Sequence, residues 1–115
     1  MKPVAVHHVQ IQVDDLDAAL RFYTEVLGLT PNPDRPDFGF PGAWLDAGAQ
    51  QVHLVVGPLP TQVGQHFALA VEDLDDAVAE LRAGGLKVSD VMEFGPFRQA
   101  MTHDPAGNTI EIRQA

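Results

Sequence analysis

The chain has 115 residues, a formal net charge of −9 and no cysteine, with 45% hydrophobic and 20% charged residues. These values are ordinary for one soluble globular domain. The acidic balance repels phosphate backbones and anionic lipids, so we expect no nucleic acid and no membrane as a partner. The lack of cysteine excludes disulfides and thiolate chemistry. Because no apolar run reaches the roughly 18 residues of a membrane span or resembles a signal peptide, the expected location is the cytoplasm.

The sequence repeats itself with a constant offset, the one that carries His8 onto His66. Residues 8–20 align with residues 66–78, and six of these thirteen positions are identical. The same offset continues without a gap into the later part of each half. A stretch rich in proline and glycine between the halves is typical of a linker. We therefore predict a duplicated unit, with one module at residues 1–57 and a second at residues 65–115.

Each half opens with a predicted strand followed by a predicted helix. Alternating apolar and polar residues favour strands at 8–13 and 66–71. The acidic pairs Asp14-Asp15 and Glu72-Asp73 offer N-cap side chains before an apolar stripe, which predicts helices that begin near residues 16 and 74. In the first half this stripe is spaced four, three and four residues apart and consists of Leu16, Leu20, Tyr23 and Leu27. The spacing predicts one continuous α-helix there.

Three short strands are expected after each helix. The segment Pro31–Pro36 is predicted to be irregular, and a central strand is not expected there because proline cannot donate to a ladder. The expected strands cover residues 38–40, 43–47, 51–56, 87–94, 97–103 and 109–113. The unit is therefore a strand, a helix and three strands, repeated twice, which predicts an α+β fold of two βαβββ modules.

Four side chains share the strand faces opposite to the apolar residues. His8 and His53 are 45 residues apart, and so are His66 and Glu111. The neighbours of each residue along its strand are apolar and point the other way. Imidazole and carboxylate ligands suit a divalent first-row metal such as zinc, nickel, manganese, iron(II) or cobalt. The sequence predicts His8, His66 and Glu111 as ligands of one such ion, with His53 either a fourth ligand or unligated.

Three stretches of the chain carry a family pattern: HHVQIQVDDL at 7–16 with Phe22, Tyr23 and LGL at 27–29; GQHFAL at 64–69; and DPAGNTIE at 104–111. Together they resemble the vicinal oxygen chelate superfamily, which includes glyoxalase I, bleomycin-resistance proteins and extradiol dioxygenases. The resemblance covers nearly the whole chain. It implies a single domain over residues 1–115, with two βαβββ modules that form a curved mixed sheet with a concave cup.

The resemblance also implies a chemistry in which one metal ion holds two neighbouring oxygens of a small substrate. By position, His8, His66 and Glu111 match the ligands of family members with two histidines and one glutamate. We therefore expect a lyase or isomerase of the glyoxalase type. His53 falls where enzymes similar to glyoxalase I carry a glutamate that helps to move the proton. The resemblance thus leaves proton transfer to Glu111 or to an unligated His53.

Two other functions are kept as alternatives. An extradiol-type ring-cleaving dioxygenase is less favoured because the only tyrosine, Tyr23, lies on the helical stripe. A metal-free small-molecule binding protein similar to bleomycin-resistance proteins is compatible with the charge of −9. It gives no reason for the His8, His66 and Glu111 side chains to share one face, and a single tryptophan offers little stacking surface.

Trp44 and Arg98 are the candidate substrate-binding residues. Trp44 matches Thr102 at the offset of the repeat, and it contacts substrate if its strand face lines the cup. Arg98 alternates with Ala100 and Thr102, a position from which it could hold a substrate carboxylate. A core aromatic residue and a surface arginine are the simpler interpretations of these two side chains. Exposed sheet edges favour a homodimer.

Overall fold

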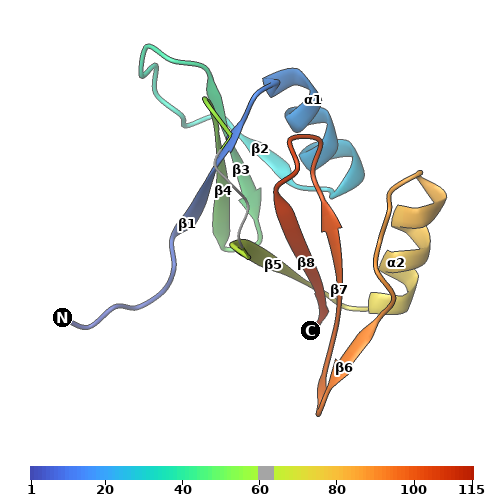
Figure 1. Ribbon diagram of the computed structural model, residues 1–115. Coiled ribbons are helices and arrows are strands. Elements are labelled where there is room, and N and C mark those ends of the chain that lie inside the picture. Colours follow the sequence, from blue (N-terminus) through green and yellow to red (C-terminus); the bar gives the residue numbers. More distant parts are fainter. Residues whose placement is uncertain (60–63) are drawn as a thin grey trace. The chain divides into compact units, whose positions relative to one another are not determined.

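Each half of the chain folds as a strand, a helix and three further strands (Figure 1). The computed structural model describes residues 1–59 and 64–115. The chain divides into two units, residues 1–60 and 61–115. The part of the expected linker at residues 60–63 lies outside the described residues. The predicted α+β fold of two βαβββ modules is confirmed.

The first unit contains a four-stranded mixed sheet with the strand order β1-β4-β3-β2. β1 (His8–Val13) pairs in parallel with β4 (Gln50–Val56). On its other side β4 pairs antiparallel with β3 (Gly42–Ala47). β2 (Thr30–Asn32) pairs antiparallel with β3 and forms the edge of the sheet. β4, the last strand of the module, therefore lies between β1, the first strand, and β3, the strand that precedes β4 in the chain.

The first helix differs from the single α-helix that the apolar stripe predicted. α1 (Leu16–Arg21) packs against β4 and continues directly as a π-helix, η1 (Phe22–Val26). In this wider turn the Leu27 N–H donates to the Phe22 carbonyl at 3.0 Å. Both Phe22 and Tyr23 are buried as a result. An apolar stripe with α-helical spacing would bury only one of these two adjacent residues. The prediction of one continuous α-helix is therefore wrong.

The segment 33–41 does not contain the strand that was expected over Phe38, Gly39 and Phe40. Gly39 adopts a φ of +80°, which turns the chain, and the two phenylalanine rings stack with centroids 5.6 Å apart. The additional strand is instead β2 at the sheet edge. Pro31 is compatible with that position because an edge strand is hydrogen-bonded on one side only.

The second unit has the equivalent sheet with the strand order β5-β8-β7-β6. β5 (His66–Val71) pairs in parallel with β8 (Thr109–Gln114), and β8 pairs antiparallel with β7 (Phe97–His103). β6 (Met92–Phe94) covers the other side of β7. α2 (Leu74–Ala83) packs against β7 and β8. No helix in the part of the chain that the structure describes is long and apolar enough to cross a membrane.

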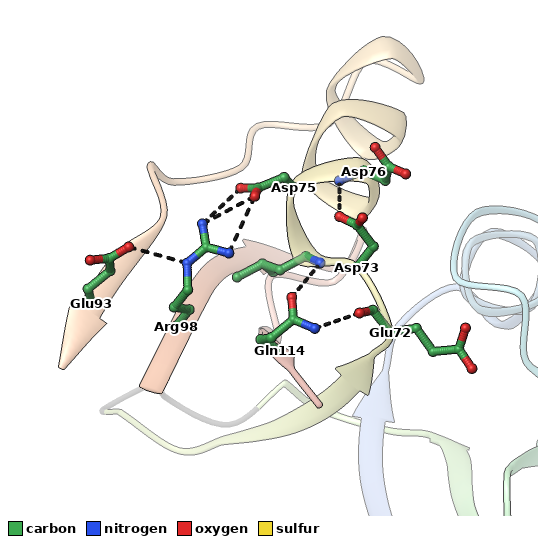
Figure 2. Close-up of polar contacts among 8 residues, drawn as sticks. Glu72, Asp73, Asp75, Asp76, Glu93, Arg98 and Gln114 are labelled. Carbon is green, nitrogen blue, oxygen red and sulfur yellow. Dashed lines mark hydrogen bonds and ion pairs between the residues drawn. The ribbon is translucent and has the colours of Figure 1, made fainter. Parts of the chain in front are cut away.

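Polar contacts fix the start of α2 (Figure 2). The Asp73 carboxylate accepts a hydrogen bond from the Asp76 N–H at 2.9 Å, which confirms the predicted N-cap. The Gln114 side chain at the end of β8 accepts from the Leu74 N–H at 3.0 Å and donates to the Glu72 carbonyl. These bonds tie the first turn of the helix to the last strand of the sheet.

The strand expected over residues 87–94 is reduced to the three residues of β6. The guanidinium of Arg82 donates to the carbonyls of Val88 and Ser89, each at 3.0 Å. A carbonyl that accepts from a side chain in this way is not part of a strand ladder. Because these two carbonyls are hydrogen-bonded to Arg82 of α2, β6 starts at Met92 and not at residue 87 as the sequence predicted.

Each sheet has one apolar face. In the first unit Val9 lies opposite Val52 in register, and in the second unit Phe67 lies opposite Ile110. The buried residues of these faces and of the helices that pack on the sheets form the cores, among them Val13, Ala19, Leu45, Val52, Leu54, Leu74, Val78, Ala100, Ile110 and Ile112. The alternate residues of the same strands face away from the helices. The alternation in the sequence predicted this division correctly.

The two halves do not keep one uninterrupted offset. His53 and Glu111 occupy equivalent places in β4 and β8, at the same offset that carries His8 onto His66. Their antiparallel partners are Trp44 in β3 and Met101 in β7, and the offset between these two is shorter by one position. Trp44 is therefore equivalent to Met101, and the predicted match with Thr102 is wrong. The connection from β7 to β8 is longer than that from β3 to β4, and this shifts one strand by one residue.

We expect the β7–β8 turn to depend on Asp104, which is 5% exposed. Its carboxylate accepts from the Asn108 N–H and from the Asn108 Nδ2, each at 2.8 Å. Asp104→Ala removes both acceptors from buried donors and should lower the free energy of unfolding by about 1–3 kcal/mol. Glu80→Ala on the exposed surface of α2 is the control, with an expected change below about 0.5 kcal/mol. Urea unfolding followed by circular dichroism measures both, and equal losses would contradict this role.

Candidate functional site

The first unit brings His8 and His53 together on the sheet face that points away from α1. Their rings stack with centroids 4.0 Å apart and planes 14° apart. His53 is buried, whereas His8 is exposed. The Nε2–H of His53 donates to Gln51 Oε1 at 2.8 Å, because an amide oxygen can only accept. The nitrogen of the neutral His53 ring that keeps a lone pair is therefore Nδ1.

His53 is held in its neutral form. Burial lowers the pKa of His53 from its ordinary value, and the positive charges of His8, His7 and Arg35 lower this pKa further. His7 precedes β1, and its Nδ1 lies 2.9 Å from Nδ1 of His8. Because His7 lies outside the strand, the alternation of side chains does not direct it to the face opposite to His8. The imidazoles of His7 and His8 are therefore in contact. A neutral imidazole is the form that can bind a metal or accept a proton.

The second unit brings His66 and Glu111 together. The Nε2 of His66 lies 3.0 Å from the Oε2 of Glu111, and the Nδ1–H of His66 donates to the Gly64 carbonyl at 2.9 Å. Both ring nitrogens thus face acceptors. The bond to Gly64, followed by the bond to Glu111, raises the pKa of His66. When the ring is neutral and the Gly64 bond is kept, Nε2 presents its lone pair beside a carboxylate.

One carboxylate oxygen of Glu111 has no hydrogen-bond partner among the described residues. The side chain is 8% exposed, and its Oε1 is buried and accepts no hydrogen bond from the described residues. The Arg113 Nη1 lies 3.8 Å from this oxygen, which is an ion-pair distance and too long for a hydrogen bond. Leaving a buried carboxylate oxygen unpaired is costly, so such an atom calls for an explanation. A bound cation or a proton to be transferred would supply one.

The four predicted ligands are thus found as two pairs, one in each unit. Within either unit, the described residues include no group of three or more histidine, cysteine, aspartate or glutamate side chains that could hold a metal ion. The second pair fits a metal, since ligating histidines commonly donate their other ring N–H to a backbone carbonyl, as His66 does. His53 fits less well because its Nε2 is used by Gln51.

A cavity of about 320 Å³ lies beside the His8–His53 pair in the first unit. Trp44 lines it and stacks on His53, with ring centroids 4.5 Å apart and planes 8° apart. The two residues are direct partners across β3 and β4. The structure therefore places Trp44 on the same face as the candidate ligand His53. Its contact with a substrate remains a prediction.

Arg98 lies elsewhere (Figure 2). Its guanidinium donates to the Asp75 carboxylate on α2, with the shortest contact at 3.0 Å, and to Glu93 on β6 at 3.3 Å. These ion pairs, that with Asp75 first, raise the pKa of Arg98. Arg98 shares its strand face with the buried Ala100 and is on the side covered by α2, opposite to Glu111. The guanidinium is thus occupied by two carboxylates of the chain, and the predicted role of Arg98 in holding a substrate carboxylate stays a prediction.

The sequence interpretation missed one wall of the cavity, which is formed by the segment 33–41. The Arg35 guanidinium carbon lies 5.1 Å from the centroid of the Phe38 ring and 5.5 Å from that of the Phe40 ring. All three residues line the cavity. The sequence does show Phe38-Gly39-Phe40 shortly after Arg35, but the spacing of two between the phenylalanines led to the prediction of a strand at residues 38–40. Gly39 bends the segment and thereby stacks the rings.

The chain belongs to the Glyoxalase/Bleomycin resistance protein/Dioxygenase superfamily, whose family model matches residues 5–112. A protein of Synechocystis sp. named "Probable lactoylglutathione lyase" is 33% identical, over 93% of this chain and 92% of that protein. The solved lactoylglutathione lyase from Agrobacterium tumefaciens is 26% identical with a TM-score of 0.81, and the match covers 100% of this chain and 96% of that one. TnmS3, an antibiotic binding protein from Streptomyces sp. CB03234, is 25% identical with a TM-score of 0.81, and the match covers 99% and 98% of the two chains.

The lengths of the relatives differ. The matches to two Arabidopsis thaliana proteins whose names include lactoylglutathione lyase cover only 34% and 43% of those proteins. The chain therefore corresponds to a part of these longer relatives, whereas it corresponds to almost all of the Synechocystis protein.

We expect His53 and His66 to titrate on opposite sides of the ordinary histidine pKa of about 6.5. In metal-free protein the ring signals of His66 should titrate above this value and those of His53 below it. Because the folded-state pKa of His66 is raised, its stabilising effect is complete below about pH 6.5 and is lost as the pH rises through that pKa. NMR titration measures both midpoints. Glu111→Gln should lower the His66 midpoint and leave that of His53 in place; an unchanged His66 midpoint would contradict the ion pair.

Proposed function

We propose that the protein is a metal-dependent enzyme of the glyoxalase type, a lyase or isomerase that acts on a small substrate with two neighbouring oxygens. Membership of the superfamily and the likeness to lactoylglutathione lyases along nearly the whole chain support this proposal. The observation that carries it is the pair of His66 and Glu111, in which one oxygen of a buried carboxylate accepts no hydrogen bond from the described residues. A structural ion pair alone does not need that free oxygen.

We assign His66 and Glu111 as ligands of a divalent metal and His8 as a further ligand, with His53 either a fourth ligand or unligated. The equal separation of 45 residues in the two pairs and their matching places on the strands support this assignment. Zinc, nickel, manganese, iron(II) or cobalt suits the nitrogen and oxygen donors. When bound, such an ion would supply Lewis-acid polarisation of the substrate oxygens.

The residues of the chain itself provide a base for moving a proton between adjacent carbon atoms. The Oε1 of Glu111, which accepts no hydrogen bond from the described residues, is the atom that can accept a proton. The Arg113 Nη1 lies 3.8 Å from this oxygen. His53 is a second candidate base because it is neutral and its Nδ1 carries a lone pair. Glu111 and His53 are the two bases that the resemblance implied. Glu111 is favoured because its Oε1 accepts no hydrogen bond from the described residues.

A second candidate function is metal-independent binding of a small aromatic molecule. The cavity beside Trp44 and the exposed rings of Phe38 and Phe40 favour it, as does the likeness to an antibiotic binding protein. This function does not explain the unpaired oxygen of Glu111. A ring-cleaving dioxygenase has less support, since the single tyrosine, Tyr23, is completely buried and cannot reach a substrate.

Metal analysis tests the ligand assignment. After loading with zinc or nickel and equilibrium dialysis, wild-type protein should retain the metal, whereas His66→Ala and Glu111→Ala should lose it. Removing a ligand should weaken metal binding by more than about 10- to 100-fold, the loss typical for groups that only support a ligand. His8→Ala should also retain less metal. His103→Ala, which changes an exposed histidine in β7, is the control. Equal metal content in all samples would remove the proposed site.

A coupled assay with methylglyoxal and glutathione tests the reaction. The metal-loaded wild type should form the lactoyl thioester, and Glu111→Gln should lower kcat by about 10²- to 10⁴-fold at matched metal content, since a general base is removed. Glu80→Gln on the exposed surface of α2 should have no effect. A larger loss with His53→Gln than with Glu111→Gln would move the base to His53. Metal retention without turnover would favour the binding function.

A further inference from the structure

The cavity of the first unit carries positive charge in an acidic protein. The chain has sixteen acidic and seven basic residues, yet no carboxylate is found among the described residues that line this cavity. The titratable groups of the lining are Arg35, His8 and His53. Arg35 is charged at every physiological pH. The local charge of the cavity is therefore opposite to that of the chain as a whole.

Arg35 has no acidic partner in the part of the chain that the structure describes. Three other arginines form ion pairs: Arg82 with Asp90, Arg98 with Asp75, and Arg113 with Glu111. In the described parts of the chain, residues 1–59 and 64–115, no carboxylate pairs with Arg35. The contact that it does make is a hydrogen bond from Nη2 to the Phe40 carbonyl at 3.0 Å. A guanidinium has five N–H donors, so most of its hydrogen-bonding capacity is available to a ligand.

The guanidinium is held in place before any ligand binds. It lies against the rings of Phe38 and Phe40, where cation–π attraction favours it. It also occupies the space that a side chain at residue 42 would need. A Cβ on Gly42 would lie 2.8 Å from the Arg35 Nη2 and 2.5 Å from the Leu54 carbonyl. The close packing against β3 restricts the arginine to the cavity wall, which lowers the entropy lost on binding.

Flat rings line the same cavity. Phe38 and Trp44 have ring centroids 6.2 Å apart, and Trp44 in turn stacks on His53. Phe38 is 49% exposed and Phe40 is 50% exposed, so a ligand that covers them removes apolar surface from water. The volume of about 320 Å³ is at the lower end of the range of ligand sites and suits a molecule with one or two rings.

We propose that this cavity binds a small planar conjugated carboxylate, with Arg35 pairing to the carboxylate and the rings of Trp44 and Phe38 contacting the flat hydrocarbon part. Arginine is suited to this task because its fork matches a carboxylate in a bidentate geometry. The net charge of −9 acts against anions at long range, but at physiological salt it is screened over about 8 Å, so the adjacent guanidinium dominates. The proposal depends on neither a bound metal nor turnover, and it argues against a cationic ligand.

Binding is tested with four probes on the full chain after removal of metal with a chelator, so that no metal can hold the carboxylate. The probes are trans-cinnamate, the uncharged cinnamyl alcohol, the cationic cinnamylamine and the non-planar cyclohexanecarboxylate. The chain contains one tryptophan, so the indole N–H signal of Trp44 in NMR spectra reports binding at the cavity. Wild-type protein should bind cinnamate at least about 10-fold more tightly than each other probe, since charge and planarity both contribute.

Variants separate the charge of Arg35 from general charge effects. Arg35→Gln should abolish the preference for cinnamate over cinnamyl alcohol, and Arg35→Lys should keep part of it. Arg21→Gln removes one positive charge from the exposed surface of α1 and should leave the preference unchanged. If Arg35→Gln fails to fold, the wild-type probe series and Arg35→Lys still decide the question.

Three results would overturn the inference: no preference of the wild type for cinnamate, tighter binding of cinnamylamine, or an unchanged preference in Arg35→Gln. The lyase assay is run separately on the metal-loaded protein. Turnover without cinnamate binding would remove this inference and leave the proposed function in place. Cinnamate binding without turnover would support this inference and count against the proposed lyase or isomerase function.

Discussion

The alternation of side chains across paired strands is the constraint on which the rest of this protein depends. In each unit the first strand pairs in parallel with the last, and this register places two polar residues 45 positions apart on one face. Because the other face is apolar, a slip by one residue would expose the core and bury the polar groups. The energy of the cores therefore holds the His8–His53 and His66–Glu111 pairs in place. Candidate chemistry and stability rest on the same register.

Equivalent positions in the two units have acquired opposite electrostatics. Burial beside other cationic groups keeps His53 neutral, whereas two acceptors favour the charged form of His66. The carboxylate of Glu111 takes the place that an imidazole holds in the first unit. The same scaffold thus carries two imidazoles in the first unit, His8 and His53, and an imidazole beside a carboxylate in the second, His66 and Glu111.

The cavity shows how a small change in a loop alters a repeated fold. Trp44 is opposite His53, whereas Met101 is opposite Glu111, so the second unit has no indole at this place. The segment 33–41 adds Arg35 and two phenylalanine rings to the first unit, whereas in the second unit only residues 95–96 join the equivalent strands β6 and β7. Both differences arise in connections between strands, which tolerate changes of length and sequence better than the strands they join.

The sequence by itself determined the duplicated βαβββ architecture, the helix N-cap at Asp73 and the shared face of each candidate pair, because strand alternation and capping are local and periodic. Only the tertiary structure decided the π-helix after Arg21, the edge strand β2, the register of Trp44 and the position of Arg98 under α2. These depend on which distant group satisfies a backbone bond or a charge. Arg98 illustrates the reason: the alternation in the sequence predicts that it lies on a strand, whereas its ion pair with Asp75 depends on how α2 packs on the sheet.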